Sequence, residues 1–439
     1  MTAPLDIFCS ALKKGLGRTM ILLSEAPDNP EFSQALLHAC LVNQVYDRQC
    51  EEDRVKYLYD LISQTGDREF YRAELFRHLL MPAPEPEAID KAQIYGILCC
   101  IAAERHDDDR RVLHEFLIEA DYNSIASICI YRYVWLEGVD GFLFCVRQFL
   151  ESLTDDFSEN GWVVSSLLDT LKERDGEDAS MEALEKARSG WPKLDELLRL
   201  NAAKDNAVAS SPELGLDYAA VKVSLDPKRG FPRSWINSAT AEELILAARD
   251  LLNESDEKKI WRYLQVFGGK DFPLPPSDLY RFFGSDNKRV SGAAVRALRR
   301  LSHPDVRELA LKTIVEGTNP ELAIRLLASN FRSGDLRAVE ALIDRSCPDE
   351  ETWHRIGLAL LELLRWASVS PEESRSLLLK LYEQTPCSLC RGSFAEKLSA
   401  AGYVPDWMAR EARFDADPTT ASLFKVDAGA ASNAQVAGG

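Results

Sequence analysis

The cysteine pair in Cys387-Ser388-Leu389-Cys390 is the chain's one C-x-x-C. Thiolates at this spacing can bind zinc or exchange with a disulfide. A structural zinc needs four ligands, however, and there is no second such pair. The nearest histidine in sequence, His354, lies 33 residues before Cys387. A redox motif is typical of a βαβ setting, and no such pattern is visible. We therefore expect no metal and no cofactor, with Cys387 and Cys390 as weak metal candidates only.

A group of basic residues is the second feature that could carry chemistry. Arg296 and Arg300 are four residues apart, so they share one face of a helix. Such a ridge could bind phosphate or an acidic protein, and Trp261 and Tyr263 lie nearby in sequence. The alternative, which we favour, is that arginines such as Arg307 and Arg337 bond neighbouring turns as a structural ladder. The candidate basic ridge consists of Lys288, Arg289, Arg296, Arg299 and Arg300.

Other patterns argue against an enzyme. Gly268-Gly269-Lys270 lacks the rest of a phosphate-binding loop, and no serine nucleophile elbow is present. Acidic runs such as Asp107-Asp108-Asp109 sit where a helix begins, and the helix dipole favours acids there, so we expect solvated caps and not a catalytic pair. Trp353, Trp366 and Trp407 read as aromatic residues of the core or of a terminal cap. We expect no catalytic residues and a chain that is not an enzyme.

The elements that must position these residues are short amphipathic helices, clearest over 286–345. Asp305-Val306-Arg307 is echoed 30 residues later by Asp335-Leu336-Arg337. Self-similarity at this period is typical of a helical solenoid. Helices of about 10 to 12 residues are marginal alone in water, so each must bury its apolar face against a neighbour. Stacked helix pairs are therefore predicted.

The repeat resembles HEAT-type repeats of the short class named after phycobilisome lyases. The resemblance rests on Ala-Ala-Val-Arg-Ala-Leu (293–298) followed by Asp-Val-Arg-x-x-Ala (305–310), and it covers about 60 residues, with a weaker extension to about 150. Members of this family mostly act as protein-binding scaffolds, and a few bind nucleic acid or carry an active site. The resemblance thus implies an all-α solenoid of antiparallel helix pairs with a superhelical course.

The less common members of that family supply two alternatives. HEAT-like DNA glycosylases use a concave basic surface with aromatic residues, which would be the ridge at 288–300 here. HEAT-like hydroxylases hold two irons with several His-Glu pairs, whereas His114-Glu115 stands alone among six scattered histidines. We expect His114 to lie on a helix surface beside Glu115. The order of segments from Pro386 to Thr420 resembles the terminal element of some bacterial HEAT-like proteins, which suggests a bacterial source.

Charge and composition narrow the functional classes. The chain has 439 residues and a net charge of −18, and residues 1–200 hold 37 acidic against 21 basic side chains. This acidity disfavours nonspecific binding to nucleic acid or anionic lipid. It would favour a basic partner, and the alternative, which we favour, is that it serves solubility alone. There is no apolar run of membrane-spanning length and no signal-peptide pattern. Ten cysteines without framework spacing fit a reducing cytoplasm.

The predicted organisation has five parts. It comprises an acidic N-terminal helical array (1–199), an irregular linker (200–237), HEAT-like repeats (238–385), a C-terminal cap (386–425) and a disordered tail (426–439). From this we expect a noncatalytic cytoplasmic scaffold that binds a protein partner through its concave or acidic face. The alternatives are a nucleic-acid-binding or repair protein that uses the basic ridge, and a HEAT-like metalloenzyme.

Overall fold

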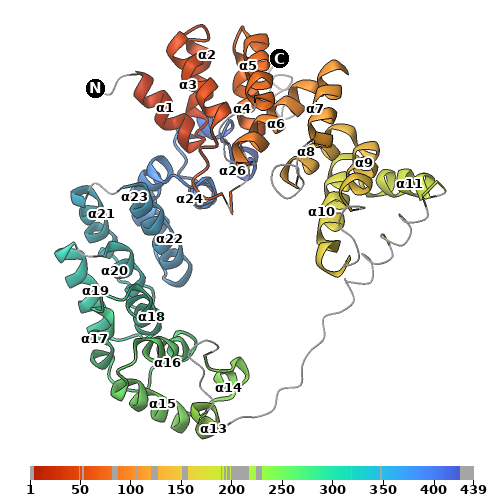
Figure 1. Cartoon of the computed structure of the whole chain (residues 1–439). Helices are drawn as coiled ribbons and strands as arrows, with labels where there is room; N and C mark the ends of the chain where they lie inside the picture. The colour runs from red at the N-terminus through yellow and green to blue at the C-terminus, as the bar shows by residue number, and fades with distance from the viewer. Residues whose placement is uncertain are drawn as a thin grey trace, which may run out of the picture. The chain divides into compact units, whose positions relative to one another are not determined.

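The computed structural model describes residues 4–48, 50–51, 54–81, 88–104, 107–119, 127–150, 157–188, 190–191, 194, 198, 217–223, 230–317, 319–346 and 349–425. All regular structure in these residues is helical, which confirms the all-α prediction (Figure 1). The chain folds as two compact units. Unit 1 comprises Met1–Ser210 and Asp406–Gly439, and unit 2 comprises Ser211–Pro405. The predicted tail at 426–439 lies outside the described residues.

Unit 1 contains helices from both ends of the sequence. The hydrophobic period and the turn residues predict helix starts at 4, 31, 51, 68, 88, 124, 139, 159 and 179, and all except the one at 51 lie within three residues of an observed start. The helices of unit 1 are α1 (Pro4–Lys14), α2 (Arg18–Glu25), α3 (Pro30–Leu41), α4 (Val55–Gln64), α5 (Arg68–Leu80), α6 (Ala88–Ala102), α7 (Asp107–Glu119), α8 (Ser127–Glu137), α9 (Val139–Leu150), α10 (Phe157–Asp175), α11 (Glu177–Arg188), α25 (Asp406–Ala412) and α26 (Pro418–Phe424).

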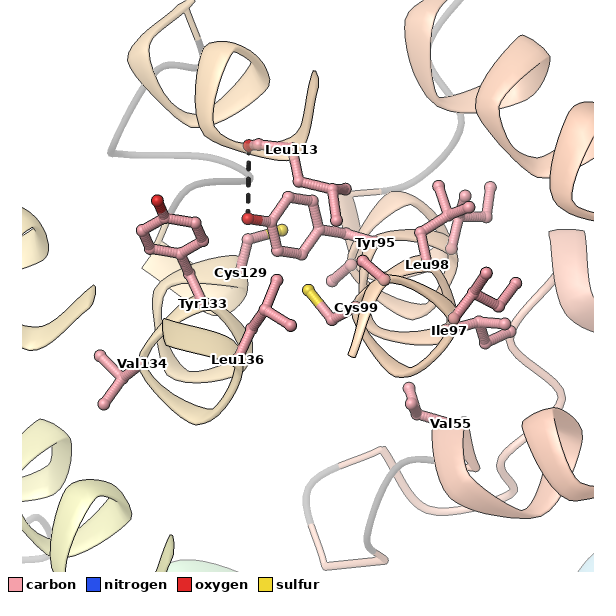
Figure 2. Packing of buried hydrophobic residues seen from close by; sticks show 14 of the residues in the cluster. Val55, Tyr95, Ile97, Leu98, Cys99, Leu113, Cys129, Tyr133, Val134 and Leu136 are labelled. Carbon is pink, nitrogen blue, oxygen red and sulfur yellow. Dashed lines mark hydrogen bonds between the residues drawn. The ribbon is translucent and has the colours of Figure 1, made fainter. Parts of the chain in front are cut away.

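Helix α6 lies at the centre of unit 1. It contacts α3, α4, α5, α7 and α8, so it is apolar on nearly every side, as its sequence predicts. Tyr95 is fully buried there, and its hydroxyl donates to the carbonyl of Leu113 on α7 at 3.4 Å (Figure 2). Cys99 and Cys129 lie buried in the same cluster. Burial raises the pKa of both thiols, which keeps them protonated and unreactive.

A break after Lys14 divides the segment that the sequence predicts as one helix over 4–22. Gly15 has a φ of +71°, in the left-handed region, so α1 ends there. Arg54, whose side chain is only 4% exposed, donates to the carbonyls of Leu12 and Lys13. These are carbonyls that the end of α1 leaves without a partner inside the helix.

Residues 406–425 pack against this break. The amide of Ala416 donates to the carbonyl of Gly15 at 2.9 Å, and α25 contacts α2. Arg18 forms a bidentate ion pair with Glu411, at 2.8 Å and 3.4 Å, and its guanidinium lies 5.6 Å from the Trp407 ring. The segment predicted as a single C-terminal cap, 386–425, is therefore divided, because its second half buries its apolar side in unit 1.

Unit 2 contains the repeat region. Its helices are α13 (Tyr218–Val223), α14 (Arg233–Ser238), α15 (Ala241–Asn253), α16 (Glu257–Gly269), the 3-10 turn η2 (Pro276–Leu279), α17 (Tyr280–Phe283), α18 (Lys288–Leu298), α19 (Pro304–Glu316), α20 (Pro320–Leu326), α21 (Asp335–Ser346), α22 (Glu350–Trp366), α23 (Pro371–Gln384) and α24 (Ser388–Ala400).

Alternate helices of unit 2 form two layers. One layer runs α16, α18, α20, α22 and α24, each in contact with the next, and the other contains α19, α21 and α23 (Figure 1). Small residues on α18 permit this packing, since Ala293, Ala294 and Ala297 are fully buried. Each helix thus covers its neighbours within a layer and across to the other layer, as the 30-residue repeat predicts.

The region predicted as an irregular linker, 200–237, contains two short helices in its described part. Residues 217–225, in which the sequence suggests one short strand, instead contain α13. Trp235 on α14 is fully buried, and its ring lies 5.5 Å from Tyr218 and 5.2 Å from Phe231. The predicted packing of Tyr218, Val221, Phe231 and Trp235 is thereby confirmed.

Helix starts follow the predicted capping residues at two sites and not at a third. Thr240 forms the predicted capping box with Glu243, and the hydroxyl of Ser370 accepts from the amide of Glu373. The predicted cap at Asp305 is wrong, because Pro304 already occupies the first turn of α19 and His303 accepts from the amide of Asp305 at 3.3 Å. Proline fixes φ in the helical range, and the helix starts two residues earlier than a cap at Asp305 would place it.

Thr240→Ala is expected to lower the free energy of unfolding of unit 2 by about 1 kcal/mol, because the amide of Glu243 loses its acceptor. Thr240→Ser keeps the hydroxyl and should retain most of that energy. Urea unfolding followed by circular dichroism measures the difference. Equal losses for the alanine and serine variants would show that the hydroxyl is not the stabilising group.

Candidate functional site

Helix α18 positions the five residues of the predicted basic ridge. Asn287 caps its start by accepting from the amide of Arg289, and the buried face carries Val290 and Leu298. Arg296 and Arg300 are exposed, as are Lys288 and Arg289 at the first turn. The helix therefore directs its basic side chains away from the core of unit 2.

The ridge residues do not act as one group. Arg300 pairs with Asp271 at 3.2 Å, in the turn after α16. Arg289 and Arg262 lie over the Trp261 ring, at 5.8 Å and 4.2 Å from its centroid. Arg299 instead pairs with Glu362 on α22. Three of the five ridge residues, Arg289, Arg299 and Arg300, thus contact three different partners.

Three guanidinium groups lie close together in the layer α18–α20–α22, and two of them share one carboxylate. Glu362 pairs with Arg299 and, at 3.3 Å, with Arg325 on α20. Burial lowers the pKa of Arg299, and the charges of Arg325 and Arg296 lower it further. Burial also lowers the pKa of Arg325 and of Arg296. We call Arg296, Arg299 and Arg325 the arginine cluster. Mutual lowering of this kind means that the three positive charges lie close enough to repel one another.

Exposed apolar side chains lie beside the arginine cluster on α22. Leu358, Glu362 and Trp366 follow at intervals of four residues, so they share one helix face. Leu358 is 40% exposed and Trp366 is 65% exposed. The expectation that Trp366 is a core or cap residue is wrong, because it is the last residue of α22 and most of its surface is exposed, with the Arg365 guanidinium 6.0 Å from its ring. The four-residue spacing of Leu358, Glu362 and Trp366 is the sequence pattern that could have predicted this exposed face of α22.

The structural ladder expected of the repeat arginines is confirmed for Arg307. Its guanidinium donates to both oxygens of Asp335, at 3.1 Å and 2.6 Å, and so links α19 to α21. Asp335 also accepts from the amide of Arg332 at 2.9 Å. In the same way Arg355 on α22 pairs with Glu321 on α20 at 3.6 Å. These arginines therefore connect successive helices within each layer.

The C-x-x-C pair lies close in space to His354, which is distant from it in sequence. His354 on α22 meets Cys387 and Cys390 at the start of α24, and one ligand atom from each lies within 4.8 Å of the others. His354 Nδ1 and Cys390 Sγ are 3.7 Å apart. Both cysteines are buried. Residues 355–386, between His354 and Cys387, include most of α22 and all of α23, and this helical hairpin brings the histidine back to the pair.

His114 and the acidic run at 107–109 have structural roles. His114 Nδ1 lies 2.6 Å from the Tyr133 hydroxyl, and its ring packs 4.3 Å from Phe144. Asp109 is buried and binds Arg72 on α5 through both oxygens, with the Nε–Oδ2 distance 2.7 Å. His114 thus packs between helices, where a helix-surface position was predicted, and Asp109 is not the solvated cap predicted for the acidic runs.

Comparisons with known proteins add little to this geometry. No protein-family model matches the chain, and no curated protein matches it. One solved structure, titled as an engineered protein, covers 95% of this chain and 97% of its own at 15% identity, with a TM-score of 0.20. That score is too low to support a shared fold. Within the described residues, none of the helices is long and apolar enough to cross a membrane.

Proposed function

We propose that this chain is a noncatalytic HEAT-like scaffold that binds a protein partner through the layer α18–α20–α22. The observation that carries the proposal is the arginine cluster, in which Arg299 and Arg325 pair with Glu362 and Arg296 lies close to both arginines, on a face that also exposes Trp366 and Leu358. Arginine and tryptophan are the residues that most often dominate the binding energy of protein interfaces. A superhelical course of the repeats would extend this face into a groove.

The positive charge of the arginine cluster determines which kind of partner this face of the layer α18–α20–α22 can bind. Repulsion among Arg296, Arg299 and Arg325 weakens when an additional carboxylate enters the cluster, so an acidic segment of a partner fits it. The acidic residues of 1–200 favour a basic partner by the same reasoning. We assign the acidic partner to unit 2, because its positive charges are concentrated and adjoin apolar side chains.

A fluorescent poly-glutamate peptide tests this assignment. We expect salt-sensitive binding to the full chain, and at least about a tenfold loss of affinity in Arg296→Glu, since a charge reversal at close range costs about 1.4 kcal/mol or more. The ion pairs of Glu362 involve Arg299 and Arg325, so this variant leaves them in place. Arg337→Glu, exposed on α21 in the other layer, is the matched control. Equal affinity of both variants and the parent would refute an acidic partner at this face.

Nucleic-acid binding is the second candidate function. The observation that favours it is Trp261, whose ring has the guanidinium groups of Arg262 and Arg289 nearby, because an aromatic residue with neighbouring arginines can stack a base. A single-stranded oligonucleotide at about 50 mM salt gives the strongest electrostatic association. Binding that collapses when Arg296, Arg299 and Arg300 are replaced together would support it. An absence of binding at that salt concentration would exclude this function.

A further inference from the structure

The side chains of His354, Cys387 and Cys390 form a cluster that the proposed scaffold function does not use. Cys387 is 3% exposed and Cys390 is 6% exposed, whereas His354 is half-buried. Cysteines elsewhere in the described core, such as Cys40 and Cys145, contribute to apolar packing. Here two sulfurs and an imidazole nitrogen converge instead, which is the donor set of a soft divalent cation.

The separations of these atoms suit tetrahedral zinc. Bond lengths of about 2.3 Å to sulfur and about 2.0 Å to nitrogen place tetrahedral ligand atoms about 3.5 to 3.8 Å apart. Cys390 Sγ and His354 Nδ1 are already 3.7 Å apart, and all three ligand atoms lie within 4.8 Å of one another. Shifts of about 1 Å at most would therefore complete three corners of a tetrahedron.

The helices on both sides hold these groups in place. Cys387 is the N-cap of α24 and Cys390 lies in its first turn, where the partial positive charge of the helix end favours thiolates. Gly357 follows His354 by one turn on α22, and a Cβ there would lie 3.0 Å from the Phe394 ring and 3.4 Å from Thr385 Oγ1. The missing side chain lets α22 approach the α23–α24 connection closely enough for His354 to reach the cysteines.

We propose that His354, Cys387 and Cys390 bind one Zn²⁺ ion, with a fourth position open to water or to an exchangeable ligand. Three protein ligands and one open position are the arrangement of exchangeable rather than closed structural zinc sites. Binding replaces two thiol protons, which leave to solvent, while the imidazole binds in its neutral form. Affinity should therefore fall as the pH is lowered toward about 5, where protons compete for all three ligands.

Cobalt titration of the full chain, purified under reducing conditions and stripped with a chelator, tests the proposal. We expect one Co²⁺ per chain, with the strong visible bands of tetrahedral cobalt and a thiolate charge-transfer band, all displaced by Zn²⁺. Cys387→Ser, Cys390→Ser and His354→Ala should each weaken binding by at least about tenfold. The exposed residues Cys9 and His38 provide matched controls, and Cys9→Ser and His38→Ala should leave the titration unchanged.

The cobalt titration of the unsubstituted protein tests the proposal even if a variant fails to fold. Substoichiometric cobalt, or bands without thiolate charge transfer, would overturn the proposal, as would a Cys387–Cys390 disulfide that persists after reduction with excess phosphine. A titration unaffected by all three ligand substitutions would do the same. Loss of metal without loss of poly-glutamate binding would show that this site and the partner-binding face are independent.

Discussion

Gly17→Val is expected to release residues 406–425 from unit 1. A Cβ at Gly17 would lie 1.7 Å from the carbonyl oxygen of Glu411 and 2.8 Å from its carbonyl carbon. The contacting atoms belong to the backbone, so a side-chain rotation cannot relieve the clash. We expect a loss of about 3 kcal/mol, the upper part of the range for overpacking, because the Arg18–Glu411 ion pair and the Ala416–Gly15 hydrogen bond are also broken.

Hydrogen exchange of the α25 and α26 amides measures this release, and thermal unfolding measures its cost. Gly66→Val is the control, since the nearest atom to a Cβ at Gly66 is an Asp28 carboxylate oxygen at 3.8 Å. The control should leave exchange at 406–425 unchanged. Normal protection of α25 in Gly17→Val would mean that α2 and α25 do not approach as closely as the structure places them.

Asp335→Ala is expected to destabilise the α19–α21 contact by about 3 kcal/mol. Asp335 is 5% exposed and accepts three hydrogen bonds, two from the Arg307 guanidinium and one from the amide of Arg332. Removing one partner of a buried ion pair leaves the other charge without compensation, which costs about 3–5 kcal/mol. The Arg307 side chain is 25% exposed, so water reduces this cost toward the lower value.

Asp344→Ala provides the comparison on the same helix. Asp344 is 59% exposed and pairs with Lys380 at 2.6 Å, and a pair of this exposure contributes less than about 1 kcal/mol. Hydrogen exchange of α19 and α21 should therefore accelerate in Asp335→Ala and change little in Asp344→Ala. Similar exchange in both variants would show that Asp335 does not stabilise the contact between α19 and α21.

The sequence predicted the helices of this chain well because helix starts are local. Thr240 with Glu243, and Ser370 with Pro371, specify their helices through residues three positions apart or fewer. Gly15 was harder to interpret, since Leu5, Phe8, Leu12 and Leu16 continue a helical period through the break. The residues that pack against Gly15, Ala416 and Arg54, are distant from it in sequence, and a Cβ at Gly15 would lie 2.6 Å from the Cβ of Ala416.

The candidate sites were less predictable because they depend on contacts between helices. The composition of α18 suggested a ridge, but only the packing of α18, α20 and α22 brings Arg325 and Glu362 to Arg299. Similarly, His354 is 33 residues from Cys387 in sequence and within 4.8 Å in space. A 30-residue repeat predicts that such returns occur, but it does not predict which side chains meet.

Unit 1 is discontinuous, and this has a consequence for synthesis. Helices α25 and α26 are synthesised after every helix of unit 2. The contacts of Gly15 with Ala416 and of Arg18 with Glu411 can therefore form only when translation is almost complete. Until then the surface around Gly17 is uncovered, while unit 2 can already have folded. A nascent chain arrested shortly after Pro405 should therefore be a better substrate for chaperones than the released protein.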